Sequence, residues 1–239
     1  MRLSQQDLDL LTQYDTPTIC NVIELFNIRP RDTGYMDRRI QAWYPTMAPI
    51  VGYAATATYR AGVAPRSGDV YGSLDQQVAG FEGLDGQALV VFQDLDDPSA
   101  AASFGEVMCS TYKAYGAVGL ITSGTGRDIE QVRTLDFPVF ADGAICSHGY
   151  GHTVDIGVPV RVGGLPVFNG DLLHADGNGV TNLPHEIAAQ AAHACGEYIA
   201  AEQIVLDYLK SDQLTPAGLA QVRAESKSQI TALGERLRG

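Results

Sequence analysis

Residues 85–143 alternate between short apolar runs and helical stretches, and this alternation limits the possible folds more than any other feature of the chain. The run "DGQALVVFQD" precedes a helical stretch at 105–115, the run "AVGLIT", a short helical stretch near 128–135 and the run "PVFADG". A repeated succession of strand, helix and strand favours parallel pairing with right-handed crossovers. The order predicts an α/β fold.

The flanking segments differ in character from this centre. Helical spacing on both sides of "DTPT" predicts two short helices before residue 27, "VGYAATATYRAG" predicts a strand and "SLDQQVAGFEGL" a helix. Residues 154–180 carry short alternating runs broken by Gly and Pro, which are typical of antiparallel ribbons or a partial barrel. Past Pro184 the pattern is helical, with a long helix at 186–209 and a last one from about Ala217.

Composition and charge exclude several classes of function. Lys plus Arg total 16 against 28 Asp plus Glu, a net charge of -12, so we expect no direct nucleic-acid partner. The N-terminus has no signal-like apolar stretch and no apolar run approaches the length of a membrane span, so we expect a cytoplasmic protein without membrane contact. Four scattered cysteines indicate reduced thiols rather than a disulfide framework.

The segment "LITSGTGRDIEQV" (120–132) allows three interpretations. Its glycines, with Asp142 after the next strand, suggest a dinucleotide-binding turn, although Ile129 replaces the third glycine. Alternatively, Asp128 caps the following helix, with Gln131 completing a capping box. In the third, the pair Arg127-Asp128 lies at the carboxyl end of a strand, where arginine holds a carboxylate and aspartate a hydrated divalent cation.

Other polar segments supply weaker candidates. In "SFGEVMCSTYKAYG", residues 103–105 lead into a helix whose free amides suit a carboxylate, and Glu106 lies in its first turn. His148 and His152 have the spacing of metal ligands on a helix, but the glycines between them argue against a helix there. "HADGNG" (174–179) resembles half a calcium loop but favours a tight turn between strands.

Several stretches together resemble the RraA-like family, in the same order. They are "VGYAATA", "GEVMCSTYKAYGAVGLITSGTGRDI", "FPVFADG" and "VPVRVGGLPVFNGDLLHADGNGV", within roughly residues 15–185. The family includes divalent-metal-dependent aldolases for 4-hydroxy-4-methyl-2-oxoglutarate and 4-carboxy-4-hydroxy-2-oxoadipate, and the regulator of ribonuclease E activity A. The resemblance implies a swivelling β/β/α sandwich assembled into trimers or hexamers. We therefore expect an RraA-like domain at 1–185 and a C-terminal helical extension at 186–239 that makes oligomer contacts.

The resemblance also implies roles for individual residues. Arg127 corresponds to the arginine that contacts substrate, Asp128 to the carboxylate that anchors Mg²⁺ or Mn²⁺, and Glu106 to an acidic position near the catalytic water. Gly105, Glu106, Val107 and Met108 correspond to the loop whose amides hold the carboxylate of pyruvate. The implied function is a class II aldolase that cleaves a 4-hydroxy-2-oxo acid to pyruvate and also decarboxylates oxaloacetate. The alternative is a non-catalytic trimeric regulator that binds the ribonuclease E and RNA-degradation machinery.

Overall fold

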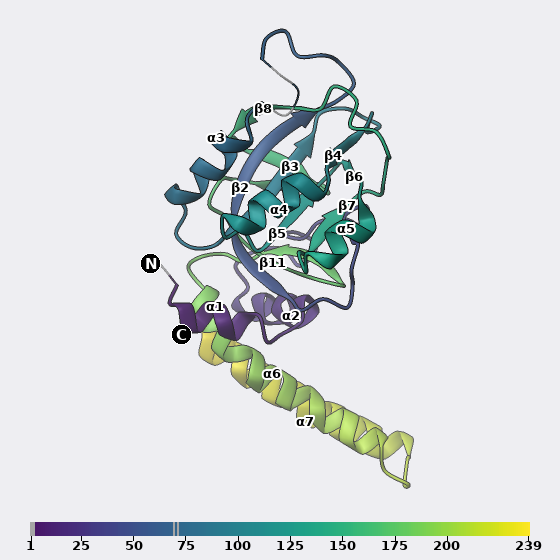
Figure 1. Cartoon of the computed structure of the whole chain (residues 1–239). Helices are drawn as coiled ribbons and strands as arrows, with labels where there is room; N and C mark the ends of the chain where they lie inside the picture. The colour runs from purple at the N-terminus through teal and green to yellow at the C-terminus, as the bar shows by residue number, and fades with distance from the viewer. Residues whose placement is uncertain (1–2, 69, 71) are drawn as a thin grey trace.

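The computed structural model describes residues 3–68, 70 and 72–239, and a mixed β-sheet forms the centre of this part of the chain (Figure 1). The sheet order is β1-β7-β5-β3-β2-β11-β12, with β8 on the far end of the long strand β2. Strands β2, β3, β5 and β7 are parallel, and the others in this sheet pair antiparallel. These strands span Gln41–Ala42 (β1), Ile50–Arg60 (β2), Ala88–Asp94 (β3), Gly119–Thr122 (β5), Val139–Ala141 (β7), His152–Ile156 (β8), Leu172–Asp176 (β11) and Gly179–Asn182 (β12).

Each face of the sheet is covered by a different kind of structure. The antiparallel pair β9 (Val160–Val162) and β10 (Leu165–Val167) packs on one face. The other face carries α3 (Leu74–Ala79), the 3-10 turn η1 (Gly80–Gly83), α4 (Glu106–Ala114) and α5 (Ile129–Thr134). Strand β3 supplies both layers, because Leu89 and Val91 face the ribbon while Val90 and Phe92 face the helices. These layers confirm the predicted β/β/α sandwich with a partial barrel.

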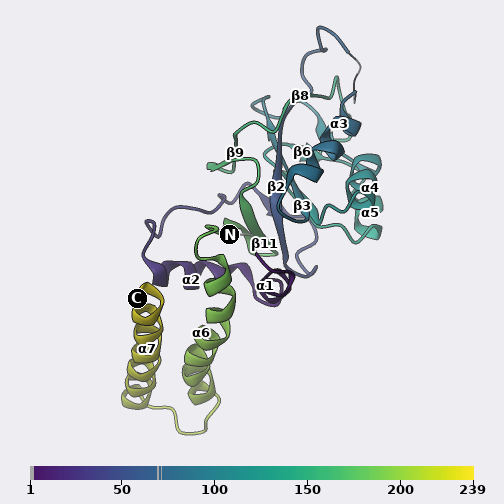
Figure 2. The ribbon, with the colours of Figure 1, turned by 90° about the vertical axis from the view of Figure 1, so that its left-hand side faces the viewer.

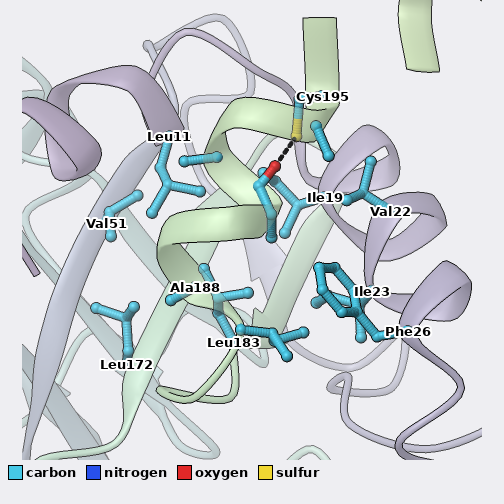
Figure 3. Packing of buried hydrophobic residues seen from close by; sticks show 14 of the residues in the cluster. Leu11, Ile19, Val22, Ile23, Phe26, Val51, Leu172, Leu183, Ala188 and Cys195 are labelled. Carbon is cyan, nitrogen blue, oxygen red and sulfur yellow. Dashed lines mark hydrogen bonds between the residues drawn. The ribbon is translucent and has the colours of Figure 1, made fainter. Parts of the chain in front are cut away.

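The two ends of the chain share a third core. Helices α1 (Gln5–Leu11) and α2 (Thr16–Phe26) pack with the first half of α6 (Ala188–Leu209) against one end of β2 and β11 (Figure 3). Asp15 caps α2 through the amide of Thr18, as "DTPT" predicts. Beyond this core, α6 and α7 (Pro216–Arg238) project from the domain as a two-helix hairpin (Figures 1 and 2).

The predicted helices and main strands are confirmed, with one difference that bears on the site. Residues treated as loop and turn form a separate parallel pair, β4 (Ala102–Phe104) with β6 (Thr125–Gly126). Short strands of two or three residues carry too little alternation to be recognised in a sequence. "HADGNG" is the tight β11–β12 turn, as expected. Within the described residues, no helix is both long and apolar enough to cross a membrane.

Candidate functional site

The β4–β6 pair brings the Arg127-Asp128 segment against the start of α4. The amide of Arg127 donates to the carbonyl of Phe104, 3.1 Å away, at the point where β4 ends and α4 is about to begin. Two glycines make this approach possible. A Cβ on Gly126 would lie 2.2 Å from Cζ of Phe104, and one on Gly105 would lie 2.5 Å from Oδ2 of Asp128. Side chains at either position would separate the two segments.

Asp128 does not cap its own helix through its side chain, so the capping-box prediction with Gln131 is wrong. Its backbone is left-handed, with φ 62° and ψ 43°, and the side chain makes no capping hydrogen bond to α5. Instead, Oδ2 accepts a hydrogen bond from the amide of Glu106 at 3.0 Å. Nε of Arg127 lies 3.7 Å from the same oxygen. The carboxylate thus occupies the positive end of α4, where it is electrostatically favoured.

The backbone amides at the start of α4 differ in whether they have a hydrogen-bond acceptor within the described protein. The amide of Glu106 is taken by Asp128, whereas those of Val107 and Met108 have no acceptor among the described residues. Val107 is 74% exposed, so this helix start is open to ligands. Two of the amides that were expected to bind a substrate carboxylate therefore remain free to do so.

The glycine turn has no phosphate cradle. The amide of Gly124 donates to Oγ1 of Thr122 at 2.9 Å, and that of Gly126 donates to the carbonyl of Gly143 at 3.1 Å. A dinucleotide turn needs such amides free to face the pyrophosphate. Asp142 lines a different cavity of about 560 Å³, with Asp94 and Arg161, beyond the ends of the parallel strands. This geometry does not fit the nucleotide interpretation.

A pocket of about 220 Å³ brings together all of the residues singled out in the two loops. It is smaller than the roughly 300–1,000 Å³ of pockets for drug-sized ligands, so it suits a small acid. Its walls also include four residues that the sequence analysis did not single out, from β2, α3 and β8. The lining residues are Tyr59, Leu74, Gln77, Gly105, Glu106, Val107, Met108, Arg127, Asp128 and Thr153.

One of the four missed residues had left a signal in the sequence. Gln77 lies three residues after Leu74 and directly before Val78, and both Gln77 and Val78 are buried. A polar side chain on the apolar stripe of a helix usually has a specific partner. Tyr59 and Thr153 left no comparable signal, because the pairing of β8 with β2 brings them to the pocket.

The buried side chains of α4 next to the pocket-lining Met108 are uncharged. On α4, burial raises the pKa of the Cys109 thiol, with a smaller contribution from the Asp128 carboxylate. Burial likewise raises the pKa of Tyr112 well above its usual value. Both side chains therefore keep their protons at neutral pH. The charges that a ligand meets come from Arg127, Asp128 and Glu106 at the more exposed side.

The carboxylate of Asp128 leaves one oxygen available to a hydrated cation. Asp128 uses only Oδ2 for protein hydrogen bonds, which leaves Oδ1 for another ligand. The described part of the chain contains no group of three or more His, Cys, Asp or Glu side chains placed to hold a metal. Mg²⁺ commonly binds through one or two carboxylates and completes its shell with water and substrate, whereas zinc sites need three or four protein ligands.

The remaining candidates lie outside this pocket. His148 and His152 each direct Nδ1 to a nearby backbone carbonyl, and His152 opens strand β8, so the pair does not lie on a helix. Lys113 is held at the far end of α4, where Nζ donates to the carbonyls of Leu135 and Asp136. Lys113 is not among the residues that line the pocket.

Sequence and structure comparisons place these features in a known group. Residues 16–181 match the sequence model of the RraA-like family, described as Aldolase/RraA. A protein of Halalkalibacterium halodurans, provisionally named 4-hydroxy-4-methyl-2-oxoglutarate aldolase, is 28% identical over 190 residues, or 76% of this chain and 80% of that protein.

Two solved structures share the fold. An uncharacterised protein of Pseudomonas syringae pv. tomato superposes with a TM-score of 0.72 at 20% identity, covering 94% of this chain and 95% of that one. RraAS2 of Streptomyces coelicolor, described as an unusual member of the RNase ES inhibitor RraA protein family, gives 0.66 at 23% identity, covering 84% and 97%. Since the family match spans more than half of the sequence, the chain belongs to the RraA-like family.

Proposed function

We propose that this protein is a divalent-metal-dependent lyase that cleaves a 4-hydroxy-2-oxo acid and releases pyruvate. The observation that carries the proposal is the placement of Asp128 and Arg127 over the open amides of α4, inside a pocket of small volume. The provisional name of the Halalkalibacterium relative supports the same reaction.

Each polar group at the pocket has a role in the proposed reaction. The amides of Val107 and Met108, at the positive end of α4, bind the substrate's C1 carboxylate. Arg127 donates to a substrate carboxylate or to the oxygen that becomes negative as the C3–C4 bond breaks. Glu106 lies at the pocket and holds the water that removes the proton of the C4 hydroxyl and later protonates C3.

Asp128 would hold the cation, Mg²⁺ or Mn²⁺, through the oxygen that α4 does not use. When bound, the cation supplies Lewis-acid stabilisation of the negative charge that develops on the C2 oxygen. The amide of Glu106 orients the carboxylate for this role, since its hydrogen bond fixes Oδ2. Loss of carbon dioxide from oxaloacetate develops the same negative charge, so we propose oxaloacetate decarboxylation as a second activity.

We also propose that the chain forms a homo-oligomer through its C-terminal helices. The projecting hairpin of α6 and α7 exposes large apolar side chains that the chain itself does not cover, and such exposure marks interfaces. These side chains are 39–55% exposed: Ile199, Leu206, Leu209 and Leu214. Light scattering coupled to size exclusion measures the mass directly, with a trimer or hexamer expected and a monomer contradicting the proposal.

The proposed reaction is tested by pyruvate release from 4-hydroxy-4-methyl-2-oxoglutarate and from oxaloacetate. We expect release with Mg²⁺ or Mn²⁺ and its loss when a chelator is added. No release with either metal contradicts the enzyme function. The alternative is a regulator, since the Streptomyces protein is described as a member of an RNase ES inhibitor family. A stoichiometric complex with ribonuclease E, together with no metal binding by calorimetry, would support this alternative.

A further inference from the structure

Gln77 lies buried at the wall of the pocket opposite the charged loops. It is 6% exposed and comes from α3, whereas Arg127 and Asp128 immediately precede α5. In both ribbon views α4 lies between α3 and α5 (Figures 1 and 2). Gln77 therefore comes from a helix on the other side of α4 from α5, and it lines the same cavity as Arg127 and Asp128.

Two hydroxyl groups hold the carboxamide of Gln77 in place. The buried hydroxyl of Tyr112, on α4, donates to Oε1 of Gln77. On the other side, Nε2 of Gln77 donates to Oγ1 of Thr153, at 2.5 Å. Because burial raises the pKa of Tyr112, its hydroxyl keeps its proton and remains a donor. This arrangement turns the amide nitrogen, rather than the amide oxygen, toward Thr153 of β8, which lines the pocket together with Gln77.

The amide nitrogen has one hydrogen more than its partners use. A carboxamide carries two N–H donors, and among the described residues only Thr153 accepts from Nε2. A buried donor without an acceptor is costly, so a buried amide beside a cavity is suited to a ligand oxygen. Around it the pocket is lined by the apolar side chains of Leu74 and Met108 and by the hydroxyl-bearing side chains of Tyr59 and Thr153. The second N–H of Gln77 thus gives this end of the pocket a neutral donor.

We infer that Gln77 is a specificity-determining residue, which donates a hydrogen bond to a terminal carboxylate of the substrate at the end remote from Arg127 and Asp128. This rests on the proposed function, because it takes the 2-oxo end of the substrate to lie at α4. A neutral donor attracts an anionic acceptor and gains nothing from a methyl group. The preferred substrates are then dicarboxylic 2-oxo acids over monocarboxylic ones of the same length.

The test compares two unreactive ligands that differ at the remote end. 2-Oxoglutarate and 2-oxopentanoate have chains of equal length, and only the first has a terminal carboxylate. Calorimetric titration in the presence of Mg²⁺ gives the affinity of the full-length protein for each. We expect the unmodified protein to prefer 2-oxoglutarate by about 10- to 100-fold, the range for a hydrogen bond to a charged group.

Gln77→Glu is the informative variant because it keeps the size of the side chain and can still accept from Tyr112. It places a carboxyl group where the N–H donor stood, so we expect the preference for 2-oxoglutarate to vanish while 2-oxopentanoate binding changes less than about threefold. Gln77→Met, which removes the donor without adding charge, should lose the preference as well. The matched control is Gln76→Met on the exposed face of the same helix, which should retain it.

The outcomes separate this inference from the proposed reaction. If Gln77→Glu loses the same affinity for both ligands, the role of Gln77 is merely structural and the inference is overturned. The inference is also overturned if the unmodified protein binds neither acid, or binds both with equal affinity. A Gln77-dependent preference in a protein that releases no pyruvate would support the inference and refute only the proposed reaction. In an active enzyme, Gln77→Glu should raise KM for oxaloacetate more than it lowers kcat, and a fall in kcat alone would contradict the assignment.

Discussion

Replacing Gly105 by alanine tests whether the close contact between the two loops is what forms the site. Gly105 has an extended backbone, with φ -161° and ψ -165°, which alanine adopts without strain. The substitution therefore acts only through the added methyl group. That group would lie 2.5 Å from Oδ2 of Asp128 and 3.2 Å from Cγ and Nε of Arg127.

The size of the effect follows from these distances. Ordinary contacts begin near 3.4 Å, so the carboxylate of Asp128 must retreat by about 0.9 Å, the difference between 3.4 and 2.5 Å. A displacement of about 1 Å at a reacting centre costs on the order of 100-fold in rate. We expect kcat/KM for pyruvate release to fall by about that factor. Weakening the hydrogen bond from Glu106 should lower the free energy of unfolding by about 1–2 kcal/mol.

The assay combines pyruvate release, followed through NADH oxidation by lactate dehydrogenase, with urea unfolding. The matched control is Gly83→Ala, at a position where an added Cβ meets open space. We expect this control to keep full activity and to change the unfolding free energy by less than about 0.5 kcal/mol. If Gly105→Ala behaves like Gly83→Ala, then the packing of Gly105 against Asp128 does not set the geometry of the site.

Three further substitutions test the interactions that hold Asp128 and His174. Asp128→Asn should leave the free energy of unfolding nearly unchanged, because asparagine tolerates the left-handed backbone and can still accept a hydrogen bond from the amide of Glu106. Asp128→Ala should lower the free energy of unfolding, measured in urea, by roughly 1–3 kcal/mol. Equal stabilities of the two variants would contradict these roles of the side chain. His174 is fully buried between Thr16 and the carbonyl of Leu11, and burial lowers its pKa. Because the folded state disfavours the protonated ring, its contribution to stability is complete above about pH 6.5 and is lost as the pH falls toward the lower folded pKa. Between pH 8 and pH 5, His174 should therefore lower the free energy of unfolding by at most about 1.4 kcal/mol for each pH unit. His174→Gln should remove this part of the pH dependence. An unchanged pH dependence in the variant would refute the role given to His174.

The sequence predicts the layers of this fold well because strong periodicities survive in its long elements. The runs that became β2, β3 and β5 are apolar and bounded by turn residues, so their tertiary environment agrees with their local preference. The β4–β6 pair could not be predicted in the same way. Its strands span three and two residues, and its existence depends on a contact across about twenty residues of chain.

The candidate site shows the same division between local and non-local information. Arg127 and Asp128 could be singled out because two oppositely charged residues follow an apolar strand, and because the pair matches a motif of the RraA-like family. The direction of the Asp128 carboxylate could not, since it is set by the left-handed backbone and by the amide of Glu106 on a different helix. Local capping rules assume that the side chain of an N-cap residue accepts a hydrogen bond from its own helix. Here the side chain of Asp128 accepts from the start of a neighbouring helix instead.

The most direct test of the account is kcat/KM for pyruvate release from 4-hydroxy-4-methyl-2-oxoglutarate, measured across a Mg²⁺ titration for the unmodified protein and for Asp128→Asn. We expect pyruvate release by the unmodified protein to depend on the metal, and we expect the folded variant to lose at least about 100-fold in kcat/KM at every Mg²⁺ concentration. Full activity in the Asp128→Asn variant, or metal-independent release by the unmodified protein, would contradict it.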